Sequence, residues 1–101
     1  MIYLCSFSEY GVQNAPSMKE FMYDKPYENQ QIIVDFLNHK GATGIVSTAY
    51  PKDLITGKRI EGELFTRKTD RFSWWSDLAY HVEKYNLRLP KEFEEYVLNN
   101  A

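Results

Sequence analysis

The sequence predicts an α+β fold, with a three-stranded antiparallel β-meander packed against a helix in the N-terminal half and two C-terminal helices. The composition is that of a globular protein, since 44% of the 101 residues are apolar and 26% are charged. Apolar residues recur with helical period near residues 25–39 and after residue 76, whereas β-branched and aromatic residues dominate the strands expected between residues 43 and 75. Length and pattern together predict one domain over residues 1–101.

The first 23 residues are the least regular part of the sequence. The stretch "IYLCSF" at residues 2–7 favours a strand, and Ser17 followed by Glu20 forms a capping box that suits a short helix. Turn-forming residues separate the two segments. We therefore expect residues 1–23 to be an N-terminal extension that could be attached only loosely.

The helix expected near residues 25–39 has consistent signals at both ends. Asp24 and Pro26 suit a helix start, and Lys40 followed by Gly41 suits a helix end. The apolar stripe between them consists of Ile32, Ile33, Phe36 and Leu37. His39 is expected in the last turn, where a cation is favoured by the helix dipole.

Three strands are expected to follow this helix. Residues 43–51, "TGIVSTAYP", are β-branched and end at a proline, and residues 72–75, "FSWW", form a short third strand. Residues 59–69 alternate, which predicts a middle strand with one covered and one wet face. The alternation groups Ile60, Gly62, Leu64 and Thr66 on one side and Glu61, Glu63, Phe65 and Arg67 on the other.

Two helices are expected to close the chain. Ser76 is a natural N-cap for the first, whose apolar face carries Leu78, Ala79, Val82 and Tyr85. This helix is expected to stop at Asn86, and Pro90 then opens the second helix, "PKEFEEYVLNN".

The adjacent tryptophans Trp74 and Trp75 pose a packing question. Neighbours in a strand point to opposite faces, so an extended chain cannot bury both indoles. If Ser76 starts the helix, Trp75 is expected to pack on the apolar stripe of that helix as its hydrophobic staple. Trp74 would then lie on the other side, either partly exposed or covered by the tail or the last helix.

Catalytic and metal-binding patterns are weak throughout the sequence. Asp77 and His81 have the i, i+4 spacing of a proton-transfer pair, but an exposed helical pair explains them more simply. His39 and His81 lack metal-ligand spacing, and Cys5 has no adjacent base to activate its thiol, which favours an inert buried cysteine. We therefore predict a non-enzyme with no catalytic residue, no cofactor and no metal.

A basic and aromatic cluster in residues 58–75 is the strongest candidate for binding a partner. Residues 51–75 hold six basic and four acidic groups, whereas the whole chain has a net charge of −2 and a pI of 5.6. Arg and Trp are frequent at protein interface hot spots, and cations interleaved with aromatic rings also suit single-stranded nucleic acid. The predicted contact residues are Lys58, Arg59, Phe65, Arg67, Lys68, Arg71 and Trp74.

The C-terminal third, "WWSDLAYHVEKYNLRLPKEFEEYV", resembles small bacterial and phage proteins that carry a tyrosine-rich EKY-x-L-x-LP-x-EF tail. With "YPKDLITGKRIEG" the resemblance covers about residues 24–98. It implies a bacterial or phage origin and an α+β fold. No activity accompanies such proteins, so the resemblance carries over no site.

We expect a small, non-catalytic, cytoplasmic protein-binding module for which a homodimer is one possible assembly. The single cysteine and the poor match of the N-terminus to a signal peptide indicate the cytoplasm, and no apolar run approaches the roughly 20 residues that span a bilayer. Two alternatives remain open. One is single-stranded nucleic-acid binding through residues 58–75, and the other is a phage- or mobile-element-encoded inhibitor of a host nucleic-acid-processing complex.

Overall fold

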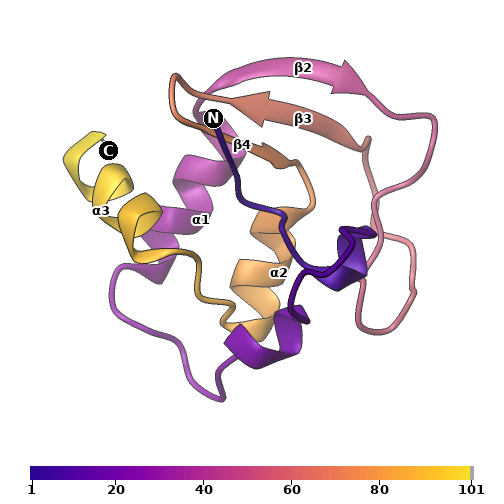
Figure 1. Cartoon of the computed structure of the whole chain (residues 1–101), viewed down its shortest axis with the longest axis horizontal. Coiled ribbons are helices and arrows are strands. Elements are labelled where there is room, and N and C mark those ends of the chain that lie inside the picture. The colour runs from indigo at the N-terminus through magenta and orange to yellow at the C-terminus, as the bar shows by residue number, and fades with distance from the viewer. Residues whose placement is uncertain (101) are drawn as a thin grey trace.

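The computed structural model describes residues 1–100, which form one mixed sheet with helices on one face (Figure 1). The elements in chain order are β1 (Ile2–Tyr3), the short 3₁₀ helices η1 (Ser8–Tyr10) and η2 (Met18–Phe21), α1 (Gln30–His39), β2 (Ala42–Val46), β3 (Phe65–Lys68), β4 (Phe72–Trp75), α2 (Leu78–Tyr85) and α3 (Lys91–Asn100). No helix within the described residues has both the length and the apolar character needed to cross a membrane.

The sheet has four strands in the order β1-β4-β3-β2. The pairs β2–β3 and β3–β4 are antiparallel, whereas β1 runs parallel to β4, with Ile2 opposite Phe72. The α+β class is therefore confirmed. The predicted three-stranded antiparallel meander is wrong because residues at the N-terminus add a fourth, parallel strand at the far edge.

The hydrophobic core lies between the sheet and the helices. Trp74 on β4 is central to it, with its ring centroid 6.3 Å from that of Phe36 on α1 and 5.9 Å from that of Phe93 on α3. The core residues are Leu4, Cys5, Phe7, Met18, Ile33, Val34, Phe36, Leu37, Phe72, Trp74, Leu78, Ala79, Val82, Leu87, Leu89, Phe93 and Val97. All three α-helices contribute to this list. Its strand residues, Phe72 and Trp74, both belong to β4, so the helices pack against β4.

The opposite face of the sheet is open. Directly opposed residues of paired strands project to the same face, and the pairs Thr66–Trp75 and Lys68–Ser73 lie on the face away from Trp74. Their side chains are half-buried or exposed, as is Tyr3 on β1. The sheet thus has one face in the core and one face available to solvent.

Trp74, not Trp75, is the tryptophan enclosed in the core, and it packs on the last helix, which was one of its two expected positions. Trp74 is 1% exposed and its Nε1–H donates to the carbonyl oxygen of Leu37 at 3.1 Å, whereas Trp75 is only partly buried. The expectation for Trp75 failed because Ser76 does not start the helix. The Ser76 N–H donates to the Phe65 carbonyl at 2.7 Å, which extends the β3–β4 ladder and keeps the strand alternation through both indoles.

Residues 1–23 are not a loosely attached extension. Leu4, Cys5, Phe7 and Met18 are core residues, each at most 5% exposed. The backbone N–H of Leu4 also donates to the Ser73 carbonyl at 2.9 Å. Short apolar segments between turns carried too little periodicity for this packing to be predicted.

The first long helix begins later than residue 25. Gln30, the first residue of α1, is buried, and its Oε1 accepts the Tyr27 N–H at 2.9 Å. Its Nε2 donates to the Val82 carbonyl at 2.9 Å on α2. Asn29 before it has a φ of 66°, outside the helical region. The end of α1 at His39 agrees with the prediction.

The middle strand is shorter than residues 59–69, and its faces are reversed. β3 covers only Phe65–Lys68, and Arg67 lies opposite Trp74 on the helix side of the sheet. Gly62 has a φ of 107°, a conformation that interrupts an extended chain and that glycine adopts without strain. The first predicted strand is likewise shorter, since β2 ends at Val46.

Candidate functional site

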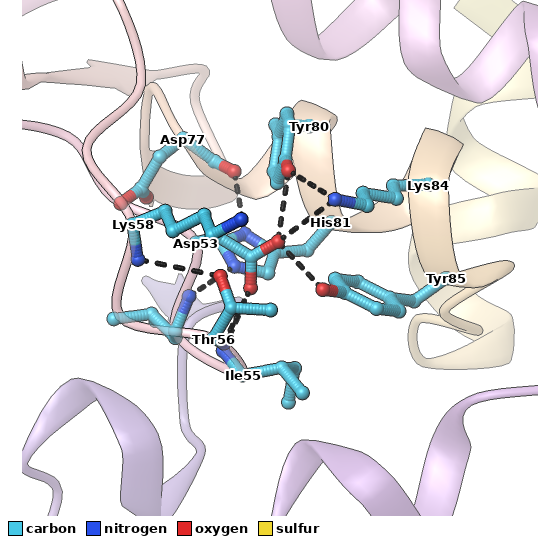
Figure 2. Close-up of polar contacts among 10 residues, drawn as sticks. Asp53, Ile55, Thr56, Lys58, Asp77, Tyr80, His81, Lys84 and Tyr85 are labelled. Atoms are coloured by element: carbon cyan, nitrogen blue, oxygen red, sulfur yellow. Dashed lines mark hydrogen bonds and ion pairs between the residues drawn. The ribbon is translucent and has the colours of Figure 1, made fainter.

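The most extensive polar cluster surrounds Asp53, in the loop between β2 and β3 (Figure 2). Asp53 is only 1% exposed. Its Oδ2 accepts hydrogen bonds from the Tyr80 hydroxyl at 2.8 Å, the Tyr85 hydroxyl at 2.5 Å and Lys84 Nζ at 3.3 Å. Its Oδ1 accepts the backbone N–H groups of Ile55 at 2.9 Å and Thr56 at 3.0 Å. Both oxygens are thus fully used by groups of the chain itself.

These contacts keep Asp53 ionised. Burial alone would raise the pKa of Asp53, but the hydrogen bonds donated by Tyr85 and the Thr56 backbone outweigh it and hold the pKa below its usual range. Burial and the bond to Asp53 raise the pKa of Tyr85 to about 12. Hydrogen bonds to Tyr80 and Asp53 raise that of Lys84 to about 12. All three pKa values are thus moved away from neutral pH, whereas an acid–base catalyst needs a pKa near the pH at which it works.

His81 joins the same loop to α2. Its Nε2 accepts the Leu54 N–H at 2.9 Å, so the ring proton lies on Nδ1, which donates to the Asp77 backbone carbonyl at 2.8 Å. The Asp77 carboxylate instead accepts the Tyr10 hydroxyl at 2.7 Å. His81 and Asp77 are both buried, at 0% and 6% exposure, so the expected exposed side-chain pair is wrong. Both ring nitrogens of His81 are engaged within the fold.

The Asp53 cluster and His81 therefore form an anchor that fixes the loop of residues 51–60 on α2. A cluster of three or more His, Cys, Asp or Glu side chains that could hold a metal does not occur within residues 1–100. Cys5 is buried as expected, and burial raises the pKa of its thiol to about 12, which suppresses the thiolate.

The predicted basic and aromatic residues do not form one continuous surface. Arg67 and Lys68 are neighbours on β3 and project to opposite faces of the sheet. Arg67 lies on the helix side, where its Nη1 donates to the carbonyl oxygen of Lys40 at 3.3 Å, at the end of α1. This contact suits the negative end of the helix dipole. Lys68 projects to the open face.

The remaining predicted contact residues are dispersed further. The guanidinium of Arg71 lies 5.7 Å from the ring centroid of Tyr96, beside α3 on the covered side of the sheet. Arg59 lies 3.5 Å from the ring centroid of Tyr50, and Lys58 is exposed in the same 51–60 loop. Phe65 is partly buried, and Trp74 is enclosed, so Trp74 cannot serve as a contact residue.

The surface that the sequence interpretation missed is the edge strand β2. All five of its residues are exposed, with Ile45 at 73% and Val46 at 59%. Residues 41–50 contain no charged side chain, although 26% of the whole chain is charged. β2 is paired only with β3, so its other edge presents unpaired N–H and C=O groups. The absence of charged residues from 41–50 could have indicated a contact surface from the sequence alone.

A β-bulge shapes this edge strand. The β2–β3 register shifts between Thr43 and Val46, and the Ile45 N–H donates to Thr66 Oγ1 at 2.9 Å. Gly44 allows the close approach, since a Cβ on it would lie 2.6 Å from Thr66 Oγ1. Bulges are one device that blunts exposed edges, but β2 carries neither a proline nor a charged side chain, which are two other such devices.

Comparison of the chain with family models, with curated proteins and with solved structures finds no match in any of the three. The candidate site therefore rests on the geometry described above. The resemblance of the C-terminal third to small bacterial and phage proteins stays a prediction.

Proposed function

We propose that the chain is a non-catalytic interaction module whose contact element is β2, and that its partner at this strand is a second copy of the chain. The observation that carries this proposal is an exposed, uncharged edge strand bearing Ile45 and Val46. Strand addition at such an edge supplies backbone hydrogen bonds, and alternate side chains then provide apolar contact.

Self-association fits β2 for two physical reasons. A two-fold axis pairs a strand with its own copy in antiparallel orientation, so the unpaired N–H and C=O groups of β2 satisfy each other and the β2 edge is no longer free. Residues 41–50 bring no charge to this contact, so like-charge repulsion across the axis is absent. A strand that must avoid its copy usually carries lysine.

The buried polar groups support binding over catalysis. The acceptor oxygens of Asp53 and the ring nitrogens of His81 are directed at the chain's own donors and acceptors. A general base needs a proton of a substrate within hydrogen-bond reach. The hydrogen bonds of Asp53 and His81 instead hold the loop of residues 51–60 against α2.

Sedimentation velocity over a wide concentration range tests the proposal. We expect a monomer–dimer equilibrium, and Ile45→Lys is expected to weaken dimerisation by about tenfold or more because it places a charge in the strand interface. Leu98→Lys is the matched control, since it introduces the same charge at an exposed apolar position on α3. Amide hydrogen exchange in β2 should slow as the protein concentration rises.

Three outcomes would contradict this function. A chain that stays monomeric at every concentration has no self-interaction at β2. Equal weakening by Leu98→Lys places the dimer contact elsewhere. A monomer that is retained on single-stranded DNA in a salt-sensitive manner favours the nucleic-acid alternative instead.

A further inference from the structure

A pocket on the open side of the sheet has a different character from the β2 edge. It has a volume of about 280 Å³ beside β4, and Tyr10, Tyr50 and Trp75 are among the residues that line it. Three charged residues also line it, namely Glu9, Lys52 and Asp77. Aromatic walls combined with carboxylates are the chemistry by which proteins bind organic cations.

Asp77 is the carboxylate in this pocket with the fewest hydrogen bonds from other residues. It is 94% buried, and its Oδ1 accepts the Tyr10 hydroxyl at 2.7 Å. Its other oxygen, Oδ2, accepts no side-chain hydrogen bond from another residue within residues 1–100, and it is not sealed from solvent, since no fully buried side-chain oxygen there lacks a partner. Burial raises the pKa of Asp77, although the Tyr10 hydroxyl and the backbone N–H of Asp77 itself favour the ionised form. A cation bound in the pocket would add a further favourable contact to this carboxylate.

Glu9 differs from Asp77 in this respect. Its Oε1 accepts the Met18 N–H at 2.8 Å, and its Oε2 accepts the Ser17 hydroxyl at 2.5 Å. The Glu9 carboxylate is therefore committed to the start of η2. Lys52 is exposed, so its ammonium group can remain in water. Asp77 is left as the carboxylate available to a ligand.

The aromatic walls are accessible and suited to a cation. Tyr50 is 59% exposed, and the Arg59 guanidinium lies 3.5 Å from its ring centroid, so this ring already makes a cation–π contact. Trp75 is half-buried on the open face, and tryptophan is the best of the aromatic residues for this interaction. Hydrated metal ions prefer clustered oxygen ligands, whereas an alkylated ammonium gains from apolar walls.

We propose that this pocket binds an organic cation with alkyl substituents, such as a quaternary ammonium group, with its charge against Asp77 and its alkyl groups against Trp75 and Tyr50. The site lies beside β4 and uses no residue of β2. It is therefore independent of the proposed self-association.

Titration of the full chain with choline and with its neutral isostere 3,3-dimethylbutan-1-ol tests the charge requirement. Binding is followed by calorimetry and by the NMR shift of the Trp75 indole N–H. We expect choline to bind and the neutral isostere to bind at least about tenfold more weakly. Equal binding of the two compounds, or no response to choline, overturns the proposal.

Variants test which residues are responsible. Asp77→Asn keeps the shape of the side chain and is expected to weaken choline binding by about tenfold. Tyr50→Ala, at an exposed position, should weaken binding without disturbing the fold. Glu63→Gln is the control, since it removes a carboxylate from the neighbouring pocket that Asp77 also lines. Unchanged affinity in Asp77→Asn, or equal loss in Glu63→Gln, contradicts the assignment.

A peptide bearing trimethyllysine distinguishes the source of the cation. Tighter binding of this peptide than of choline, with no binding of the unmodified peptide, assigns the ligand to a side chain of a partner protein. Binding of choline alone assigns it to a small molecule. Either result supports an alkylammonium site, whereas equal binding of the modified and unmodified peptides contradicts it.

Discussion

The hydroxyl of Tyr85 donates to Oδ2 of Asp53 at 2.5 Å and so joins the last residue of α2 to the loop between β2 and β3. Tyr80, five residues earlier on the same helix, donates to the same oxygen at 2.8 Å. The loop of residues 51–60 has almost no regular secondary structure, so these bonds determine its position. This position in turn sets where Tyr50 and Arg59 lie.

Asp53→Asn is expected to destabilise the fold. The amide places an N–H₂ group where the carboxylate accepts several donors, and breaking a buried charged network of this kind costs about 3 kcal/mol. Urea unfolding at pH 7 measures the change. Glu92→Gln on the exposed face of α3 is the control and should leave the free energy of unfolding nearly unchanged.

The same carboxylate predicts loss of stability in acid. Because the pKa of Asp53 is lowered in the folded state, its contribution is fully present above the unfolded value near 4 and is lost as the pH falls below it. The free energy of unfolding of the wild type should therefore fall from about pH 4 downward. In Asp53→Asn this decline should be shallower, and an unchanged slope would count against the role of Asp53.

Asp77→Asn is expected to act in the opposite direction. Burial raises the pKa of Asp77, so its ionised form is a cost to the fold at neutral pH, and that cost disappears as the pH falls through the folded pKa. The amide can still accept the Tyr10 hydroxyl. We expect the free energy of unfolding at pH 7 to rise by up to about 1 kcal/mol, measured by urea unfolding. A loss as large as that of Asp53→Asn would contradict this account.

The two tryptophans should differ in both stability and accessibility. Trp74→Ala leaves a large cavity and removes the bond to the Leu37 carbonyl, which should cost about 3–5 kcal/mol. Trp75→Ala should cost about 1 kcal/mol, because Trp75 is only partly buried. Acrylamide quenching should be weak in Trp75→Phe, where the enclosed indole remains, and strong in Trp74→Phe. Equal quenching in the two variants would be inconsistent with these positions.

Alkaline pH should destabilise the fold through the acids Cys5 and Tyr85. The pKa values of Cys5 and Tyr85 are both raised to about 12, so the unfolded state releases these protons first and is favoured as the pH rises from about 9 toward 12. Circular dichroism across this interval measures the loss. The Cys5 thiol should resist a disulfide reagent at neutral pH and react after unfolding, and rapid reaction in the folded state would argue against its burial.

The sequence predicted the elements with strong periodicity and missed those set by tertiary contacts. The helices ending at His39 and beginning after Pro90 were confirmed, because end signals and apolar stripes agreed. Ser76 carried a genuine N-cap signal, yet its N–H and hydroxyl are used by the neighbouring strand. The parallel pairing of β1 with β4 joins residues too distant in sequence for any local pattern to predict.

The candidate site was predicted less well than the fold. The basic residues of 58–75 were identified correctly as a cluster in sequence, but strand alternation and a long loop distribute them over different faces. The exposed strand β2 was predicted as a strand, and only the sheet order shows that it is an edge. The pocket beside Trp75 could not be anticipated, because its lining residues come from four separate segments of the chain.

The pairing of Ile2 with Phe72 has a consequence for how the protein is made. During synthesis the N-terminal residues leave the ribosome first, and domains generally fold as units once their parts are available. β1 therefore has no partner until the nascent chain extends beyond residue 72, and Leu4, Cys5 and Phe7 stay uncovered for that time. Completion of this fold is a late event in translation, and a chain stalled before β4 would expose an apolar N-terminus to chaperones and proteases.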